Sequence, residues 1–396
     1  MLNTAGSKRI LALISERGGG DAPPVITLAS ALQNRGNTVT VLCDTKTEQT
    51  VRSAGLESVV IPDELEQGRH VDPRWLIRLK ERGEELTADT PNPLTIWAEH
   101  CMPTADPMVQ EIQPDCLISS LFCTSLTNLL GKRFGIPWCF VNPSFYFGDH
   151  SIQSWEGDFV GLAAGWFRYI LLPHCDQADL VLHATDREFD PPPPGLPSHH
   201  HYIGPLFWEP RQQEQAAFLN TPGAPWALIS LSTVPMGGEL AIAHSALKAL
   251  AEKPIRTLLT LAPEYPRNEL GPVPENVTVS GFVPHGQVLD NAALVVSHAG
   301  HGIVMKSLYH GVPMVLVPWA RDQFGVAARA EAMGVAVVVK REDCSDQQML
   351  AAVNQVFEDE HFKQRASEIS QRLVNQTPEK SGCRHIEELI SHRSKT

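Results

Sequence analysis

Short apolar segments of strand length alternate with helical segments along this chain, and the alternation begins twice. It runs first from Arg9 to Ala184 and starts again at Trp226. Each helix carries the chain back to begin the next strand, so such alternation forms a parallel sheet with helices on both faces. The predicted fold class is therefore α/β, with two Rossmann-like domains facing a cleft that holds the site.

The expected elements follow from the spacing of hydrophobic residues and from the glycines and prolines at which helices and strands end. The first run is expected to contain strands at 9–15, 38–43, 117–120, 138–142 and 180–184, with helices at 25–34 and 124–134. The second is expected to contain strands at 226–231, 256–261, 277–280, 294–297, 314–317 and 335–339, with a helix at 239–251.

A chain of 396 residues is long enough for two domains of ordinary size. We expect an N-terminal domain over 1–205, a linker over 206–224 that includes the polar stretch Arg211 to Pro222, and a second domain over 225–378. Residues 379–396 are expected to form a C-terminal helix that packs back on the N-terminal domain.

Bulk properties exclude several classes of protein. The formal net charge of −13 and the lack of a long basic run exclude a nucleic-acid partner. No stretch approaches the roughly 20 apolar residues of a membrane span, and the apolar run near the start is a core strand rather than a signal peptide. The eight cysteines are scattered without a CxxC pair, which indicates reduced thiols in the cytoplasm and no zinc site. A monomer and a homodimer both remain open.

The most informative turn is His298-Ala299-Gly300-His301-Gly302, which lies between the strand 294–297 and a helix expected at 303–310. A glycine-rich strand-to-helix turn directs backbone N–H groups and the positive end of a helix dipole at one point. This pattern predicts an anion site that suits a diphosphate, with His298 as a further donor at its mouth.

A second polar pair, Asp322-Gln323, follows the strand 314–317. A carboxylate and an amide together accept from and donate to sugar hydroxyls. Phosphate and sugar recognition on adjacent loops indicate an enzyme that uses a nucleotide sugar.

Four short motifs occur in order between Gly281 and Gly334, namely F-V-P-H, H-x-G-x-G, G-V-P-M and D-Q. With these motifs the chain resembles the family 1 glycosyltransferases of the GT-B fold, in particular the bacterial natural-product and sterol-type branch, over nearly its whole length. The resemblance implies inverting, metal-independent transfer of a sugar from a UDP- or dTDP-sugar co-substrate to a hydroxyl of a hydrophobic small molecule. It implies no bound cofactor.

The resemblance also assigns donor-binding roles to individual residues. The ring of Phe282 would lie on the nucleobase, the backbone of Val283 at the base edge, and His285 near the ribose. His298 would contact the diphosphate, which the remaining positions surround: Ser232, Thr233 and the backbone N–H groups of Gly300, Gly302 and Ile303. Asp322 and Gln323 would hold the sugar, while His301 either reaches the donor or fills the turn.

Two positions depart from the family pattern. Lys306 stands where the family has a glutamate that accepts from the ribose hydroxyls, and Ile303 replaces a serine or threonine. An ammonium group donates and does not accept, so recognition of the ribose must differ. Either nucleotide affinity is reduced, or Lys306 turns towards a phosphate or a sugar acid.

Inverting transfer requires a base that takes the proton of the acceptor hydroxyl. Many relatives place a histidine in the first strand-to-helix turn, but here residues 16–24 resemble the R-G-D-x-x-P turn of the glycopeptide and sterol branch. That resemblance makes Asp21 the catalytic base. Alternatively, Asp21 only caps the helix that begins near Pro23 or Pro24.

Less specific interpretations compete with these. Gly18-x-Gly20 with Asp44 at the end of the second strand is compatible with a dinucleotide site, although Pro23 occupies the third glycine position. The run of histidines at 199–201 is more typical of a solvated turn than of a metal site. His183, at the end of an apolar strand, is more typical of a hydrogen-bonded core histidine.

Aromatic residues gather between positions 145 and 169, where the family lines its acceptor site, and Trp155 and Phe159 are weak acceptor candidates. Two other functions stay open. The chain could be a non-catalytic nucleotide-binding partner of another glycosyltransferase, or a GT-B-fold epimerase acting on the nucleotide sugar itself.

Overall fold

The computed structural model describes residues 7–15, 20–61, 82–83, 87, 89–146, 166–209, 219, 223–233, 235 and 237–393. The chain forms two compact units. Unit 1 comprises Met1–Gln153, Asp158–Pro210 and Thr377–Thr396, and unit 2 comprises Ser154–Gly157 and Arg211–Gln376. Each has the parallel α/β architecture expected from the alternation of strands and helices, so the predicted fold class of two Rossmann-like domains is confirmed.

Unit 1 contains a seven-stranded parallel sheet with the strand order β3-β2-β1-β4-β5-β6-β7. Its strands are β1 (Arg9–Leu13), β2 (Thr38–Asp44), β3 (Glu57–Ile61), β4 (Cys116–Ser119), β5 (Trp138–Asn142), β6 (Leu180–His183) and β7 (His200–Tyr202). Its helical segments are α1 (Ala22–Asn34), α2 (Thr45–Ser53), α5 (Pro93–Ile112), η2 (Leu121–Cys123), α6 (Thr124–Phe134), η3 (Trp166–Leu171), α9 (Leu172–Cys175) and α16 (Pro378–Arg393).

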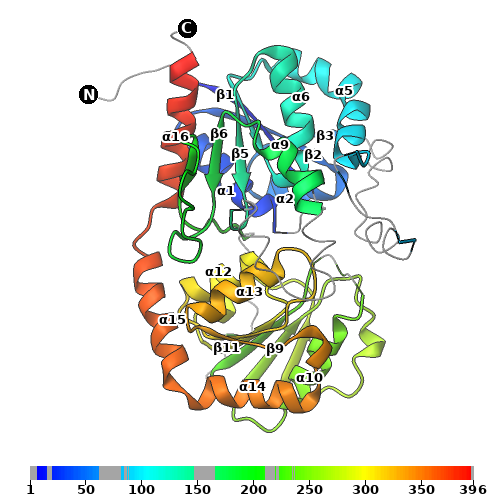
Figure 1. Cartoon of the computed structure of the whole chain (residues 1–396), viewed down its shortest axis with the longest axis vertical. Helices are drawn as coiled ribbons and strands as arrows, with labels where there is room; N and C mark the ends of the chain where they lie inside the picture. Colours follow the sequence, from blue (N-terminus) through cyan, green and yellow to red (C-terminus); the bar gives the residue numbers. More distant parts are fainter. Residues whose placement is uncertain are drawn as a thin grey trace. The chain divides into compact units, whose positions relative to one another are not determined.

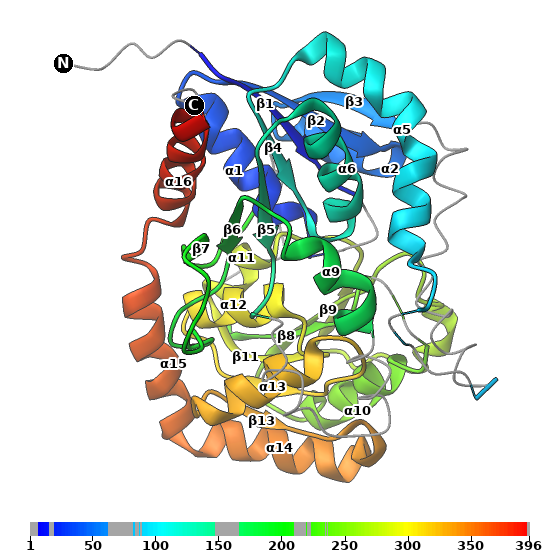
Figure 2. The ribbon, with the colours of Figure 1, turned by 45° about the horizontal axis from the view of Figure 1, so that its top comes forward.

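The central strands of this sheet are buried on both faces, which explains their continuous apolar sequences. Alternate residues of β1, such as Ile10 and Ala12, pack in one apolar core with Leu28 of α1 and Ile386 of α16. Figure 2 shows α1 and α16 on one side of the sheet and α5 and α6 on the other.

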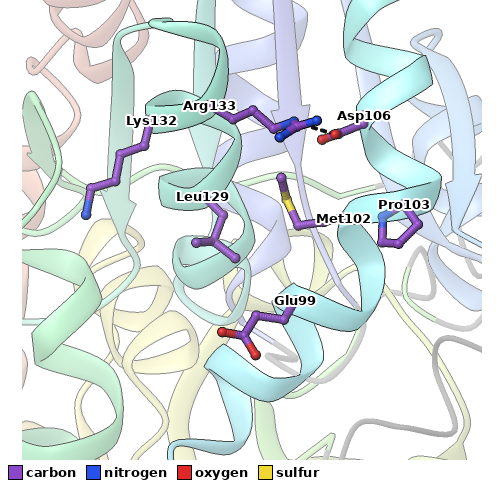
Figure 3. Close-up of a pocket in the computed structure, with 7 residues that line it drawn as sticks. All are labelled: Glu99, Met102, Pro103, Asp106, Leu129, Lys132 and Arg133. Atoms are coloured by element: carbon purple, nitrogen blue, oxygen red, sulfur yellow. Dashed lines mark ion pairs between the residues drawn. The ribbon is translucent and has the colours of Figure 1, made fainter.

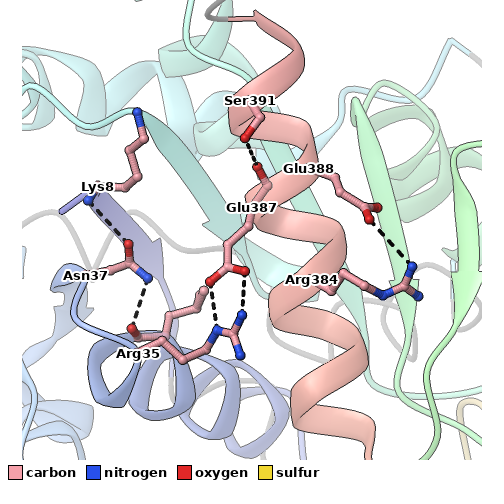
Figure 4. A network of polar contacts seen from close by, with 8 residues as sticks. Lys8, Arg35, Asn37, Arg384, Glu387, Glu388 and Ser391 are labelled. Atoms are coloured by element: carbon pink, nitrogen blue, oxygen red, sulfur yellow. Dashed lines mark hydrogen bonds and ion pairs between the residues drawn. The ribbon is translucent and has the colours of Figure 1, made fainter. Parts of the chain in front are cut away.

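The final helix, α16, belongs to unit 1 although the chain reaches it from unit 2. Cys383, Ile386 and Ile390 are buried in the same core as α1. On the rim, the Arg35 guanidinium donates two hydrogen bonds to the Glu387 carboxylate, at 2.7 and 2.6 Å (Figure 4). Apolar burial holds the helix, since an exposed ion pair contributes at most about 1 kcal/mol.

Unit 2 contains a six-stranded parallel sheet with the order β10-β9-β8-β11-β12-β13. Its strands are β8 (Trp226–Ser230), β9 (Arg256–Thr260), β10 (Val277–Ser280), β11 (Ala292–Ser297), β12 (Met314–Leu316) and β13 (Ala336–Val338). Its helical segments are α10 (Leu240–Leu250), η5 (Arg267–Glu269), α11 (His285–Leu289), α12 (His301–Tyr309), α13 (Gln323–Ala332), η6 (Arg341–Asp343), α14 (Asp346–Glu358) and α15 (Glu360–Leu373). Figure 1 shows α12 and α13 on one side of this sheet, with α10 and α14 on the other.

The structure adds two strands that the sequence analysis did not predict, β3 and β7. They are the two edges of the seven-stranded sheet. β7 also corrects the interpretation of the histidine run, because His200 is a buried strand residue and not part of a solvated turn. His183 is a hydrogen-bonded core histidine as predicted, with ring nitrogens 3.0 Å from Asn142 Nδ2 and 3.1 Å from His200 Nδ1.

All eight cysteines are free thiols, and seven of them are buried. Across the described ranges, no helix combines the length and the apolar character needed to cross a lipid bilayer. Most of the linker predicted over 206–224 lies outside the described residues.

Candidate active site

In each sheet the strand order reverses direction at one place. In unit 1 this switch point lies between β1 and β4, which pair in parallel with Leu13 beside Ser119. In unit 2 it lies between β8 and β11, where Ser230 is beside Ser297. The connections leave such a pair of strands in opposite directions and open a crevice at their carboxyl ends, which is where open α/β sheets bind ligands.

Asp21 lies at the switch point of unit 1, directly before α1. Its side chain is 2% exposed and crosses to the turn after β4, where the carboxylate accepts from the backbone N–H groups of Leu121 at 2.6 Å and Phe122 at 3.3 Å. The carboxylate makes no capping hydrogen bond to α1, so helix capping does not explain this residue.

Burial raises the pKa of Asp21 from 3.8 to about 6, because a carboxylate removed from water disfavours its charged form. Hydrogen bonds from Leu121, Phe122 and Ser120 offset part of this effect. Each carboxylate oxygen accepts more than one hydrogen bond, so the two backbone donors leave acceptor capacity for a proton. A pKa near 6 suits a general base at neutral pH, since the group is ionised yet still basic.

The structure gives the dinucleotide interpretation no support. Asp44, the candidate ribose acid, is 2% exposed and caps α2 by accepting from the Thr47 backbone N–H at 2.8 Å and from the Thr47 hydroxyl. A buried carboxylate in this position stabilises the first turn of the helix, which explains Asp44 without a bound ribose.

His298 lies at the switch point of unit 2, and its ring connects the two central strands. Nδ1 is 3.3 Å from the carbonyl oxygen of Ser230. A carbonyl only accepts, so Nδ1 carries the proton and the neutral ring presents Nε2 as an acceptor. Burial, helped by the nearby Arg321 cation, lowers the pKa of His298 to about 4, against the raising effect of the Ser230 bond.

The turn after His298 depends on glycine at one position for a steric reason. A Cβ on Gly300 would lie 2.7 Å from Nε2 of His298, whereas a Cβ on Gly302 would meet nothing within 4 Å. Gly300 is the residue before α12, and the N–H groups of the first helical turn have no partner within the helix. The structure therefore has the strand, turn and helix start expected for an anion site, with Ile303 in that first turn.

The start of the helix also fixes the positions of His301 and Lys306. α12 begins at His301, two residues earlier than predicted, and His301 is buried. Lys306 lies in the second turn of the helix and is partly buried.

Two further turns at the carboxyl ends of the sheet carry predicted donor residues. Ser232 is buried and Thr233 exposed, just after β8. The amide oxygen of Gln323 accepts from the backbone N–H groups of Trp319 and Ala320, at 2.8 and 2.9 Å, so its NH₂ group is the part of the amide that can donate elsewhere. Asp322 is partly buried immediately before α13.

The segment after β10 carries the residues that were predicted to contact the nucleobase. Phe282 is 65% exposed, whereas the adjacent Val283 is 5% exposed. An exposed phenyl ring held on a buried neighbour is a suitable stacking platform. Nε2 of His285 is 3.1 Å from the Thr260 hydroxyl, so this histidine is fixed to the end of β9.

The sequence analysis missed a polar cluster beside these residues. Arg321 Nη2 donates to Ser232 Oγ at 3.2 Å, and the hydroxyl of Tyr265 donates to the buried Glu239 carboxylate at 2.7 Å. The carboxylates of Glu239 and Asp322 favour the charged form of Arg321, although burial lowers its pKa. A basic residue directly before Asp322-Gln323 was the signal available in the sequence.

Trp155 and Phe159, the acceptor candidates, lie outside the described residues. A pocket of about 730 Å³ lies between α5 and α6, lined by Glu99, Met102, Pro103, Asp106, Leu129, Lys132 and Arg133 (Figure 3). Arg133 pairs with Asp106 at 2.5 Å, and the mixed charges of the lining favour no one ligand.

Known proteins resemble both the sequence and the fold. Residues 246–388 match the model of the erythromycin biosynthesis protein CIII-like C-terminal domain. The chain is 25% identical over 218 residues to the uncharacterized UDP-glucosyltransferase YojK of Bacillus subtilis, covering 55% of this chain and 54% of that protein. It is 22% identical over 362 residues to the NDP-glycosyltransferase YjiC of Bacillus subtilis, covering 87% and 88% of the two chains.

Solved structures support the same fold. The glycosyltransferase of kitacinnamycin superposes with a TM-score of 0.73 at 21% identity, covering 97% of this chain and 99% of that chain. The glycosyltransferase VinC in complex with dTDP superposes with a TM-score of 0.72 at 18% identity, covering 97% and 100%. The chain therefore has the GT-B fold, and the family model and the relatives together support a glycosyltransferase of natural-product type that is similar to family 1.

Proposed function

We propose that the protein transfers a sugar from a UDP- or dTDP-sugar to a hydroxyl of a hydrophobic small molecule, with inversion at the anomeric carbon and without a metal ion. The observation that carries the proposal is the buried carboxylate of Asp21, held at the switch point of unit 1 with its pKa raised to about 6. A general base is most effective when its pKa lies near the working pH.

The donor belongs to unit 2 in this proposal. Phe282 stacks on the base, the start of α12 binds the diphosphate, and Asp322 and Gln323 hold the sugar. The exposure of the Phe282 ring and the glycine-dependent turn at Gly300 support these roles. VinC, of the same fold, binds dTDP.

The reaction balances with Asp21 as the only proton acceptor. The acceptor oxygen attacks the anomeric carbon and forms the new C–O bond, while the bond from that carbon to the phosphate oxygen breaks. The hydroxyl proton passes to the Asp21 carboxylate, and the electron pair leaves on the nucleoside diphosphate. N–H groups at the start of α12 stabilise the departing charge, so activity should survive chelation of divalent ions by EDTA.

The test replaces Asp21 with asparagine. Asp21→Asn should lower kcat on the order of 100-fold or more, because the amide does not accept the proton, while UDP or dTDP binds with unchanged affinity. The matched control is Asp106→Asn, which removes a carboxylate of the same unit that pairs with Arg133. Near wild-type turnover by Asp21→Asn would remove this residue from the chemistry.

The same assay separates the two other functions. Donor turnover that requires an added acceptor supports transfer. Donor conversion without any acceptor would identify an epimerase, and nucleotide binding without turnover across a broad acceptor panel would identify a non-catalytic partner.

A further inference from the structure

Arg321 places a guanidinium in the turn after β12, and its position raises the question of where the charge for the diphosphate comes from. His298 does not supply it in this structure. Its Nδ1 proton is directed to the Ser230 carbonyl, and its remaining nitrogen, Nε2, is an acceptor. An acceptor nitrogen repels a phosphate oxygen unless the ring takes up a second proton, which burial and the neighbouring cation of Arg321 oppose.

Arg321 stands at the same end of the sheet, in the turn after β12. Its Nη2 donates to the hydroxyl of Ser232, which lies after β8, so the guanidinium reaches across the end of β11, the strand between β8 and β12. A hydroxyl that accepts from a cation is polarised and becomes a better donor itself. Arg321 and Ser232 therefore present a charged group and a hydroxyl as neighbouring donors.

The backbone of Arg321 provides an independent observation. Within the described ranges, the non-glycine residues with positive φ are Gln113, Ala299 and Arg321, at 49°, 64° and 59°. Gln113 ends α5, where a left-handed residue is common. Ala299 and Arg321 have no such explanation, and both lie in turns after central strands of unit 2. Strain of this kind persists where the surrounding structure enforces it, and it gathers at ligand sites.

A buried acid acts electrostatically on the guanidinium. Glu239 is 1% exposed, receives the Tyr265 hydroxyl at 2.7 Å, and favours the charged form of Arg321. The oxygen of Tyr265 also has a hydrogen bond with the Ser232 backbone. Glu239, which accepts from Tyr265, thus places a buried negative charge near Arg321, and Tyr265 also contacts the turn after β8.

We propose that Arg321 binds the diphosphate of the nucleotide sugar and supplies the positive charge that stabilises it as the leaving group. The inference rests on the proposed function and adds to it the residue that carries this charge. A guanidinium suits the role because it stays protonated and can make two parallel hydrogen bonds to phosphate oxygens. His298 then shapes the turn as a neutral ring over Gly300.

The test compares a nucleoside diphosphate with its nucleoside. Arg321→Met should weaken binding of UDP or dTDP about 10- to 100-fold, the range for losing a hydrogen bond to a charged group, while uridine or thymidine binds as to the wild type. Arg321→Lys keeps the charge without the planar fork and should fall between the two. Arg365→Met is the matched control, since Arg365 pairs with Glu368 on the exposed surface of α15. Isothermal titration at low and high salt measures all of these affinities.

Each outcome decides between the inference and the function on which it rests. Unchanged UDP and dTDP affinity in Arg321→Met would overturn the role of Arg321. So would a loss confined to a donor that carries a sugar carboxylate, such as UDP-glucuronate. Equal loss of nucleoside and diphosphate binding would make Arg321 a structural residue. If the wild type binds no nucleoside diphosphate, the proposed function fails before the variant is considered.

Discussion

The two switch points share a scaffold and differ in the hydrogen-bonding role of the side chain that each buries. In unit 1 the Asp21 carboxylate accepts from backbone N–H groups of the neighbouring turn, whereas in unit 2 the His298 ring donates to a backbone carbonyl of the neighbouring strand. Burial raises the pKa of Asp21 to about 6 and lowers that of His298 to about 4. The same fold thus favours a basic carboxylate on one sheet and a neutral ring on the other.

The difference teaches that the partner atom decides the chemistry of a buried group. Asp21 faces donors and keeps acceptor capacity for a proton. His298 has its N–H committed to Ser230, so the positive charge of its site is left to Arg321. Duplicated architecture carries opposite roles because each turn offers different backbone groups to one side chain.

The largest expected effect is an opposite dependence of stability on pH. The folded-state pKa of Asp21, about 6, exceeds its ordinary value of 3.8, so this group adds stability as pH falls through 6. The folded-state pKa of His298, about 4, is below its ordinary 6.5. This group therefore lowers the free energy of unfolding of the protein as pH falls below 6.5. Each shift corresponds to on the order of 3 kcal/mol at most.

Two variants separate these contributions in urea unfolding between pH 8 and pH 4. Asp21→Asn should be more stable than the wild type at pH 8, with the difference vanishing towards pH 4. His298→Asn should lose less stability than the wild type as pH falls from 7 to 4. Parallel pH profiles for both variants and the wild type would show that folding shifts the pKa of neither group. The contrast between the two switch points would then be wrong.

A medium effect is expected from adding one methyl group to each turn. Gly300→Ala should cost about 1–3 kcal/mol and weaken nucleotide binding, because the new Cβ displaces the His298 ring from Ser230. Gly20→Ala, in the turn before Asp21, meets nothing within 4 Å and should change the free energy of unfolding by less than about 1 kcal/mol. Differential scanning calorimetry of both variants measures the contrast. Equal destabilisation would mean that the turn at Gly300 is no more tightly packed than the turn at Gly20.

An effect on nucleotide binding alone, without a change in stability, should locate the nucleotide in unit 2. Phe282→Ala should weaken UDP or dTDP binding by about 1–3 kcal/mol, the usual contribution of base stacking, and leave the melting temperature unchanged because the ring is 65% exposed. Val273→Ala, another exposed apolar residue of this unit at 42%, is the matched control. Nucleotide affinity that is insensitive to Phe282 would move the base to another surface.

The sequence predicted the fold well where strands are central and poorly where they are edges. Central strands such as β4 and β11 are buried on both faces and read as apolar runs. The missed strands, β3 and β7, pair on one side only, and β7 reads His-His-Tyr. Edge strands carry polar residues, so period and hydrophobicity do not reveal them.

The candidate site was also predicted only in part. The turn at His298 was predicted because its glycines and the helix that follows form a local sequence pattern. The Arg321 cluster was missed because its bond to Ser232 joins residues 89 positions apart. Such a contact exists only after β8 and β12 come together with β11 in one sheet. The direction of the Asp21 side chain depends likewise on Leu121, 100 positions away.

The membership of α16 in unit 1 has a consequence for biosynthesis. A ribosome releases the chain from the N-terminus, and domains generally fold in that order. Here the first unit lacks part of its core, namely Cys383, Ile386 and Ile390, until nearly the whole of the second unit has been made. Unit 1 cannot complete its core, and the apolar face of α1 stays uncovered, while unit 2 is synthesised. The unit that starts first is completed last, and a nascent chain arrested before position 377 should be the form that chaperones hold.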